Sequence, residues 1–201
     1  MNGAIKRFAR AMLGDYCLYQ IYSISAEDNP VPDAGSNRFE FRSVGRVEID
    51  SSTDSLIREQ AGYLGTGTAS FGCFLDGALV ATCHYWYGER YATRNFLPIA
   101  PNEAKLVQIT TARDVRGQGV ASALIAYSAR EMFRQGFDAL YARIWHSNSP
   151  SLRAFEHAGW RRACFVIEVS PFWRNSPVRI EIWKHLRRRS APAGEVVREH
   201  D

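Results

Sequence analysis

Residues 106–133 read LVQITTARDVRGQGVASALIAYSAREMF, and they predict a strand, a turn and a helix in succession. The first six residues, 106–111, are apolar or β-branched, which is typical of a buried strand. From Val120 onward, apolar residues recur at helical spacing and indicate one broad apolar stripe. Gly117 and Gly119 therefore lie in the turn that leads from the strand into the helix.

A glycine turn in this position can bind an anion. The first N–H groups of a helix have no intrahelical acceptor, and the helix dipole adds partial positive charge there. Glycine has no side chain, so a phosphate group can approach its backbone closely. The sequence therefore predicts a phosphate-binding turn at residues 116–121.

Two other phosphate-binding motifs fit this segment less well. A nucleoside-triphosphate loop would end in Gly-Lys-Ser or Gly-Lys-Thr, and neither occurs here. Residues 117–122 come within one residue of the dinucleotide-binding pattern G-x-G-x-x-G/A. That fold also requires an acidic residue at the end of the next strand, whereas Asp138 precedes this strand and Trp145 ends it. The dinucleotide-binding interpretation is therefore the weaker one.

Residues 116–121, RGQGVA, resemble the signature of the GNAT superfamily of acyl-CoA N-acyltransferases. In that signature Arg or Gln is followed by two residues, Gly, one residue, and Gly or Ala. Residues 109–115 are similar to the strand and loop that precede it in the family. A second family motif resembles Asn148, Ser151, Phe155 and Gly159-Trp160. One helix and one strand separate the two motifs, and the resemblance covers about residues 70–170.

The resemblance implies an α/β fold in which helices cover both faces of a mixed central sheet. It implies acetyl-CoA as the acyl donor, held between two splayed strands, and direct attack by an amine on the thioester. No metal is implied. The implied donor-binding residues are Ile109, Thr110, Thr111, Arg116, Gly117, Gln118, Gly119, Val120, Ala121, Asn148 and Ser151.

The general base is the open part of this assignment. An ammonium ion has no lone pair, so the acceptor must lose a proton before or during attack. Some family members use a glutamate on the strand before the turn, and Glu103 falls at a comparable distance from Arg116. Gln108 occupies the commoner position and cannot act as a base. His84, Glu89 and a water chain are the alternatives.

Phe155 departs from the family pattern. Many members have a tyrosine there, which is thought to protonate the departing thiolate, and phenylalanine has no hydroxyl group. The general acid must then be sought in Tyr141, Ser151 or a water molecule, unless the thiolate leaves unaided.

Other elements follow from periodicity and turn residues. Asp76-Gly77 predicts a tight hairpin. Ser52 or Thr53 is expected to cap one helix, and Ser149 another that has Pro150 at its first position. The helix capped by Ser52 or Thr53 is expected to cover residues 52–64. The expected strands cover residues 16–24, 39–49, 71–75, 79–87, 137–145, 160–169 and 178–185.

The irregular segment 88–102 is interpreted as part of the acceptor site. Arg90 and Arg94 could bind a carboxylate or phosphate, and Tyr85 lies just before the segment. The expected acceptor is a small-molecule amine, such as an amino sugar or an amino acid derivative. A protein amine is the second enzymatic alternative, and a noncatalytic CoA-binding module is the third.

Composition bounds the remaining properties. The chain has 201 residues, 46% of them hydrophobic, which favours one domain over residues 1–186 and a fraying tail over 187–201. No apolar run reaches the length of a membrane span and no signal peptide is evident, so a cytoplasmic location is expected. The four cysteines show no paired spacing and are interpreted as free buried thiols.

The net charge of +4 is modest and does not demand nucleic acid, for which the sequence has no recognisable motif. The phosphates of CoA would account for part of it. A homodimer formed by strand or helix exchange at the C-terminal end is compatible with the sequence.

Overall fold

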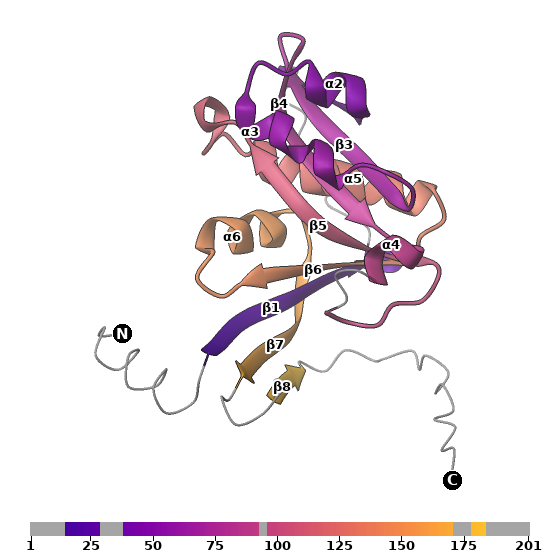
Figure 1. Cartoon of the computed structure of the whole chain (residues 1–201), viewed down its shortest axis with the longest axis vertical. Coiled ribbons are helices and arrows are strands. Elements are labelled where there is room, and N and C mark those ends of the chain that lie inside the picture. The colour runs from indigo at the N-terminus through magenta and orange to yellow at the C-terminus, as the bar shows by residue number, and fades with distance from the viewer. Residues whose placement is uncertain (1–14, 29–37, 93–95, 171–177, 184–201) are drawn as a thin grey trace, which may run out of the picture.

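The computed structural model describes residues 15–28, 38–92, 96–170 and 178–183 (Figure 1). Its centre is an eight-stranded mixed sheet with the strand order β2-β3-β4-β5-β6-β1-β7-β8. The β5 and β6 strands are parallel to each other, and every other neighbouring pair is antiparallel. The tail 187–201 lies outside the described residues.

The elements have the following bounds. The strands are β1 Asp15–Ser25, β2 Phe39–Ser43, β3 Thr68–Leu75, β4 Ala78–Trp86, β5 Glu103–Thr111, β6 Ala139–Trp145, β7 Arg161–Ser170 and β8 Val178–Trp183. The α-helices are α2 Arg46–Asp50, α3 Ser55–Arg58, α4 Gly88–Ala92, α5 Val120–Arg134 and α6 Ser149–His157. The 3-10 helices are η1 Ala26–Asp28, η2 Glu59–Tyr63 and η3 Arg113–Val115.

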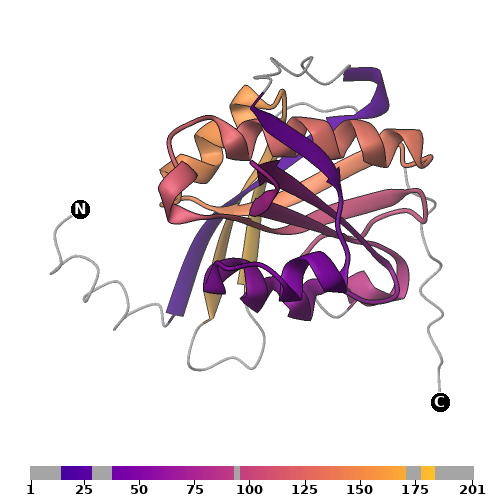
Figure 2. The same cartoon turned by 90° about the horizontal axis from the view of Figure 1, so that it is seen from above.

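Helices cover both faces of the sheet, as predicted. The long helix α5 lies on one face, and α2 and α3 lie on the other (Figures 1 and 2). The larger core cluster joins the buried side of α5, including Leu124, Ile125 and Met132, to the strands beneath it. A second cluster on the opposite face contains Tyr91, Phe96 and other aromatic residues. No helix among the described residues is long and apolar enough to cross a membrane.

The α5 helix begins at the glycine turn because of backbone conformation. Gly119 is its N-cap with φ of 79°, in the left-handed region that glycine adopts without strain. The first backbone hydrogen bond of the helix runs from the Ala123 N–H to the Gly119 carbonyl, at 3.0 Å. The predicted strand, turn and helix are therefore confirmed.

The β1 strand lies between β6 and β7 and is antiparallel to both. Tyr22 is opposite Ala142 of β6, and Ile21 is opposite Cys164 of β7. Ile21 is fully buried, and Tyr22 is 1% exposed. The strand at 16–24 was predictable from its apolar pattern, but its interior place in the sheet, between β6 and β7, was not.

The predicted strand over residues 39–49 is wrong in its second half. The β2 strand ends at Ser43, and α2 begins after Gly45. The Glu48 carboxylate accepts the Gly45 N–H at 3.0 Å, which satisfies a donor at the start of the helix. This local bond ends the strand where the apolar pattern alone would continue it.

Two predicted helix starts need correction. The helix expected over 52–64 is the short α3 followed by η2, and its cap is Asp54, whose Oδ1 accepts the Leu56 N–H at 2.7 Å. The α6 helix is capped by Asn148 and not by Ser149, because the Asn148 Oδ1 accepts the Ser151 N–H at 3.3 Å. Aspartate and asparagine are both strong N-cap residues, and at these two positions they cap the helix in place of the neighbouring hydroxyl residues that were predicted.

The hairpin and the cysteines agree with their predictions. Asp76 and Gly77 have φ of 51° and 80°, as a tight hairpin turn requires. All four cysteines are free; three are buried, and Cys17 is half-buried.

Because β1 is an interior strand, we expect the truncation of a buried side chain on it to destabilise the protein strongly. We expect Ile21→Ala to lower the free energy of unfolding by about 2–5 kcal/mol, since a fully buried isoleucine would leave a cavity. Ile180→Ala on β8 is the matched control, because Ile180 is 51% exposed. Its cost should stay within about 0.5 kcal/mol in urea denaturation. Equal costs would contradict the central position of β1.

Candidate active site

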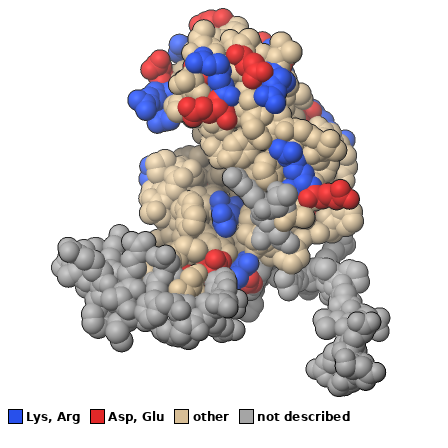
Figure 3. Space-filling view, viewed as in Figure 1, with Lys and Arg blue, Asp and Glu red and all other residues tan. Residues whose placement is uncertain are grey.

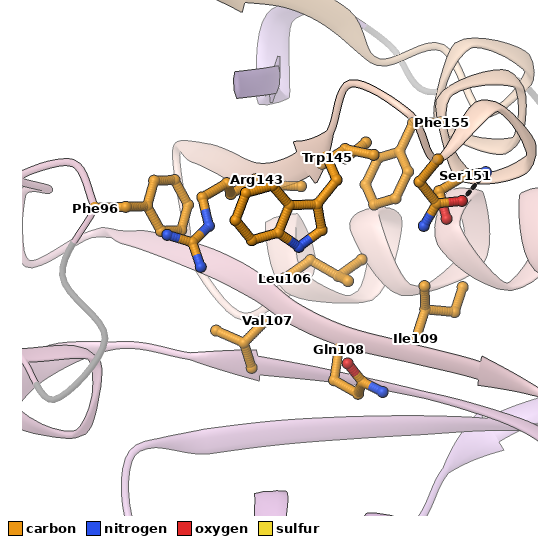
Figure 4. A pocket seen from close by; sticks show the side chains of 12 residues that line it. Phe96, Leu106, Val107, Gln108, Ile109, Arg143, Trp145, Ser151 and Phe155 are labelled. Carbon is orange, nitrogen blue, oxygen red and sulfur yellow. Dashed lines mark hydrogen bonds between the residues drawn. The ribbon is translucent and has the colours of Figure 1, made fainter. Parts of the chain in front are cut away.

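The β5 and β6 strands separate beyond a short parallel contact. Their pairing runs over four residue pairs, from Glu103 opposite Ala139 to Leu106 opposite Ala142. The β5 strand continues to Thr111 and β6 to Trp145 without further pairing between them. A cleft of about 620 Å³ opens there (Figure 4). It is lined by Phe96, Leu106, Val107, Gln108, Ile109, Ala142, Arg143, Ile144, Trp145, Asn148, Ser151 and Phe155.

A bulge in β5 lies at the narrow end of this cleft. Gln108 is opposite His84 on β4, whereas Leu106 is opposite the next residue, Tyr85. Val107 is therefore the extra residue and has no partner on β4. Val107 also lines the cleft, so the bulge and the cleft meet at this residue.

The glycine turn provides backbone donors beyond the end of β5. Gly117 and Gly119 have φ of 78° and 79°, and a Cβ built on either would meet no protein atom within 4 Å. In the described part of the chain, no backbone acceptor pairs with the N–H groups of residues 117–122. Arg116 reaches back from the turn, with its Nε donating to the Thr111 carbonyl at 3.1 Å. The predicted phosphate-binding residues therefore form one open surface at the start of α5.

The α6 helix and its cap supply one wall of the cleft. Asn148 and Ser151 line the cleft and are joined by the capping hydrogen bond. Phe155 is 2% exposed and packs edge-on against Trp160, with ring centroids 5.0 Å apart. Its ring reaches the cleft but carries no polar atom.

The other end of the cleft is aromatic and basic. Figure 4 shows Phe96 and Arg143 there, away from Ser151 and Phe155, with Trp145 between the two groups. Arg143 is the one charged side chain among the twelve lining residues. Its guanidinium carbon lies 5.5 Å from the Phe96 ring centroid and 5.3 Å from that of Trp145. The lining set contains no acidic residue.

The surface around the cleft also carries few acidic side chains (Figure 3). On the face drawn in Figure 3, most acidic side chains lie beside basic ones over the part that carries α2 and α3. Below that part the surface is hollowed, and a basic group lies there beside uncharged residues.

Lys105 supports the aromatic end from beneath. It is fully buried, and its Nζ donates to the Tyr91 hydroxyl and to the Leu97 carbonyl. The Tyr91 hydroxyl in turn accepts the Phe96 N–H at 2.7 Å, which holds Phe96 against the cleft. Burial lowers the pKa of Lys105 to about 6, although the nearby negative charge of Glu103 acts in the opposite direction and raises it.

The residues considered as bases lie outside the lining set. The Glu103 carboxylate, at the start of β5, accepts the Ala100 N–H at 2.8 Å and the Tyr141 hydroxyl at 3.1 Å. His84 is fully buried, and its Nδ1 lies 2.8 Å from the Ser70 Oγ. Burial lowers the pKa of His84 to about 4, so its ring is neutral at pH 7. Glu89 is exposed on α4. Glu103 therefore stays a prediction.

The residues considered for acceptor binding are also elsewhere. Tyr85 is fully buried on the face that packs on α5, with its hydroxyl 3.0 Å from the Ser128 Oγ. The Arg90 Nη2 donates to the Gly62 carbonyl at 3.2 Å, and its guanidinium lies over Trp86. Arg94 lies outside the described residues. This geometry gives no support to a contact between Tyr85 or Arg90 and a ligand in the cleft.

Sequence reasoning missed Arg143 and Trp145, whereas Phe96 belongs to the segment 88–102 that was expected to line the acceptor site. One signal was present, because Arg143 and Trp145 alternate with the buried Ala142 and Ile144 and so share the other face of β6. The approach of Phe96 depends on the buried contact with Lys105, which no local pattern reveals.

A mixed sheet whose one parallel pair opens beside a glycine turn at a helix N-terminus is the arrangement that the resemblance implies. The model of the acetyltransferase (GNAT) family matches residues 19–160 of the sequence. The chain belongs to this family of acyltransferases.

Solved structures show the same fold. A protein assigned to the GNAT acetyltransferases from Novosphingobium aromaticivorans has 21% sequence identity and a TM-score of 0.55, over 77% of this chain and 64% of that one. A GNAT-family acetyltransferase from Colwellia psychrerythraea has 15% identity and a TM-score of 0.55, over 84% of this chain and 62% of that one. The chain thus spans less than two thirds of either protein. A comparison with curated proteins gave no match.

Burial of Lys105 predicts a pH-dependent stability. From pH about 6 to 10.5, the unfolded side chain holds a proton that the folded one lacks, so unfolding takes up a proton. The contribution of Lys105 to the parent's free energy of unfolding should therefore increase as pH rises through this range. Lys105→Met removes the titrating group and with it this increase. In urea denaturation, the free energy of unfolding of the variant minus that of the parent should therefore decrease between about pH 6.5 and about pH 9.

Arg134→Met is the control for this experiment. Arg134 is exposed at the end of α5, and its loss should leave the pH dependence as in the parent. A pH-independent difference between Lys105→Met and the parent would mean that folded Lys105 keeps its proton.

Proposed function

We propose that the chain transfers an acetyl group from acetyl-CoA to the primary amine of a small molecule by direct attack. The observation that carries this proposal is the cleft between β5 and β6, together with the unpaired N–H groups at 117–122 in the turn that follows β5. Membership of the acetyltransferase family supports the same donor.

The donor would extend from the turn into the cleft. Phosphate would sit on the N–H groups of residues 116–121, where no side chain obstructs the glycines. Beyond Leu106, β5 has no partner on the β6 side, so Ile109, Thr110 and Thr111 offer main-chain groups to the amides of an extended arm. Asn148 and Ser151 would contact that arm from α6, because both line the cleft.

The chemistry would take place near the β5 bulge. The thioester supplies an activated acetyl group there. The N–H of Val107, the extra residue of the bulge, would donate to the oxygen that gains negative charge. Water would protonate the departing sulfur, because the Tyr141 hydroxyl donates to Glu103 and Ser151 lies at the opposite end of the cleft from Val107 (Figure 4).

The acceptor's proton would pass to water. The lining set offers no carboxylate and no imidazole, and Gln108 cannot accept a proton at neutral pH. Glu103 remains the alternative base, acting through a water chain from the start of β5.

The size of the cleft favours a small-molecule acceptor. Its volume of about 620 Å³ lies in the range of small-ligand sites, and Phe96 closes one end. A noncatalytic CoA-binding module is the second candidate, favoured by Phe155 and the missing carboxylate. Release of thiol from acetyl-CoA in the presence of amines separates the two, because a binding module would release none.

Gly119→Glu tests the donor site. The substitution places a side chain and a negative charge where phosphate should bind, so calorimetric titration with acetyl-CoA should show no binding. The parent should bind acetyl-CoA and prefer it to NADH.

Gly77→Glu in the hairpin is a matched control for this variant. Gly77 has φ of 80°, close to the 79° of Gly119, and it also has no protein atom within 4 Å of a built Cβ. The two variants should carry a similar backbone strain of about 1–3 kcal/mol, yet Gly77→Glu should bind like the parent. Acetyl-CoA binding by Gly119→Glu at parental affinity would show that the phosphate site lies elsewhere.

The pH profile distinguishes water from a side-chain base. If water takes the proton, log kcat/KM should rise with pH at a slope of about one until the acceptor's own pKa is reached. Glu103→Gln should leave this profile unchanged. A plateau that begins well below the acceptor's pKa, and that disappears in Glu103→Gln, would instead identify Glu103 as the base.

A further inference from the structure

Arg143 lies beside the reacting part of the cleft and far from the phosphate-binding turn. Leu106 is opposite Ala142, so Arg143 follows at the level of Val107. The end of β5 at Thr111 is four residues further, about 13 Å along the strand. A phosphate held at residues 116–121 would therefore be out of reach of Arg143.

Aromatic rings hold the Arg143 guanidinium in the cleft. Its carbon lies 5.3 Å from the Tyr19 ring centroid, in addition to its contacts with Phe96 and Trp145. Rings that contact the flat faces of a guanidinium leave its N–H edge free for a planar anion. In Figure 4 the Arg143 side chain lies between Phe96 and Trp145, with its nitrogen atoms toward Val107.

Nearby carboxylates have other partners. Glu168 accepts the Tyr19 hydroxyl at 3.3 Å, and Glu181 pairs with Arg179 at 2.7 Å. Among the described residues, Arg143 forms no ion pair of its own. The Arg179 guanidinium lies 5.9 Å from the Tyr19 ring centroid, but Glu181 balances its charge, so Arg143 is the cation that this end of the cleft offers to an anion.

We propose that the acceptor is an amine that carries a carboxylate, as an amino acid does, and that Arg143 binds this carboxylate. This inference rests on the proposed acetyl transfer and specifies its substrate class. A bidentate pair with the guanidinium fixes the carboxylate, and the amine, one carbon away in an α-amino acid, then lies beside Val107. An acceptor with several ammonium groups is disfavoured, because it would meet Arg143 and no acidic side chain in the lining set.

The test compares acceptors that differ in whether they carry an anionic group. Thiol release from acetyl-CoA is measured with phenylalanine and phenylalaninamide, and separately with O-phosphoethanolamine and ethanolamine. The measured quantity is the ratio of kcat/KM for the member with the anionic group to that for the partner that lacks it. Comparing this ratio between protein variants cancels differences in amine basicity.

Arg143→Gln should lower the phenylalanine to phenylalaninamide ratio by about 10- to 100-fold, mainly through KM, as expected for a lost charge-assisted pair. Calorimetric binding of acetyl-CoA should match the parent, which shows that the fold and the donor site persist. Arg134→Gln, which removes an exposed arginine on α5, should leave the ratio unchanged.

Three results would overturn the proposal. If Arg143→Gln lowered kcat/KM equally for both members of a pair, Arg143 would have a structural role only. If the ratio changed only for the phosphoethanolamine pair, the anion would be a phosphate and not a carboxylate. If no amine gave thiol release although acetyl-CoA bound, the proposed transfer itself would fail, and the substrate class with it.

Discussion

The short parallel contact between β5 and β6 is the constraint on which the site depends. The two strands share four residue pairs and then separate, yet neither wall collapses into the gap. Each is held on its far side, because β4 pairs with β5 and β1 pairs with β6 along the separated segments. The opening therefore persists because the sheet satisfies each strand's backbone from the side away from the cleft.

The same arrangement divides the cleft into parts with different chemistry. At the end of β5, the glycine turn presents main-chain donors that suit an anion whatever the nearby side chains are. At the level of Val107, the walls come from side chains of Phe96, Arg143 and Trp145, which can differ without disturbing the turn. A backbone site for a common donor beside a side-chain site for an acceptor fits a family in which one fold serves many substrates.

Local signals made the strand, turn and helix around Gly119 predictable from sequence. Positive φ, helical periodicity and β-branched residues act over a few neighbours, so each leaves a readable pattern. The end of β2 was missed because the bond between Glu48 and Gly45 outweighs the apolar pattern. The roles of Lys105 and Arg143 at the acceptor end were missed for a different reason, since these residues meet Phe96 only after the strands have assembled. Arg90, which was chosen from the segment 88–102, lies on α4 and donates to the Gly62 carbonyl on the same face.

The place of β1 has a consequence for how the molecule forms during synthesis. Its partners lie far along the chain; the Tyr22 hydroxyl, for example, donates to Glu156, 134 residues later. The antiparallel strands β2, β3 and β4 follow one another and can pair soon after they leave the ribosome, but β1 must wait for β6 and β7. During that interval its apolar residues and both of its edges are uncovered, which is the condition under which nascent chains aggregate or recruit chaperones. The half of the sheet that carries the β6 wall of the cleft is therefore the last to be completed.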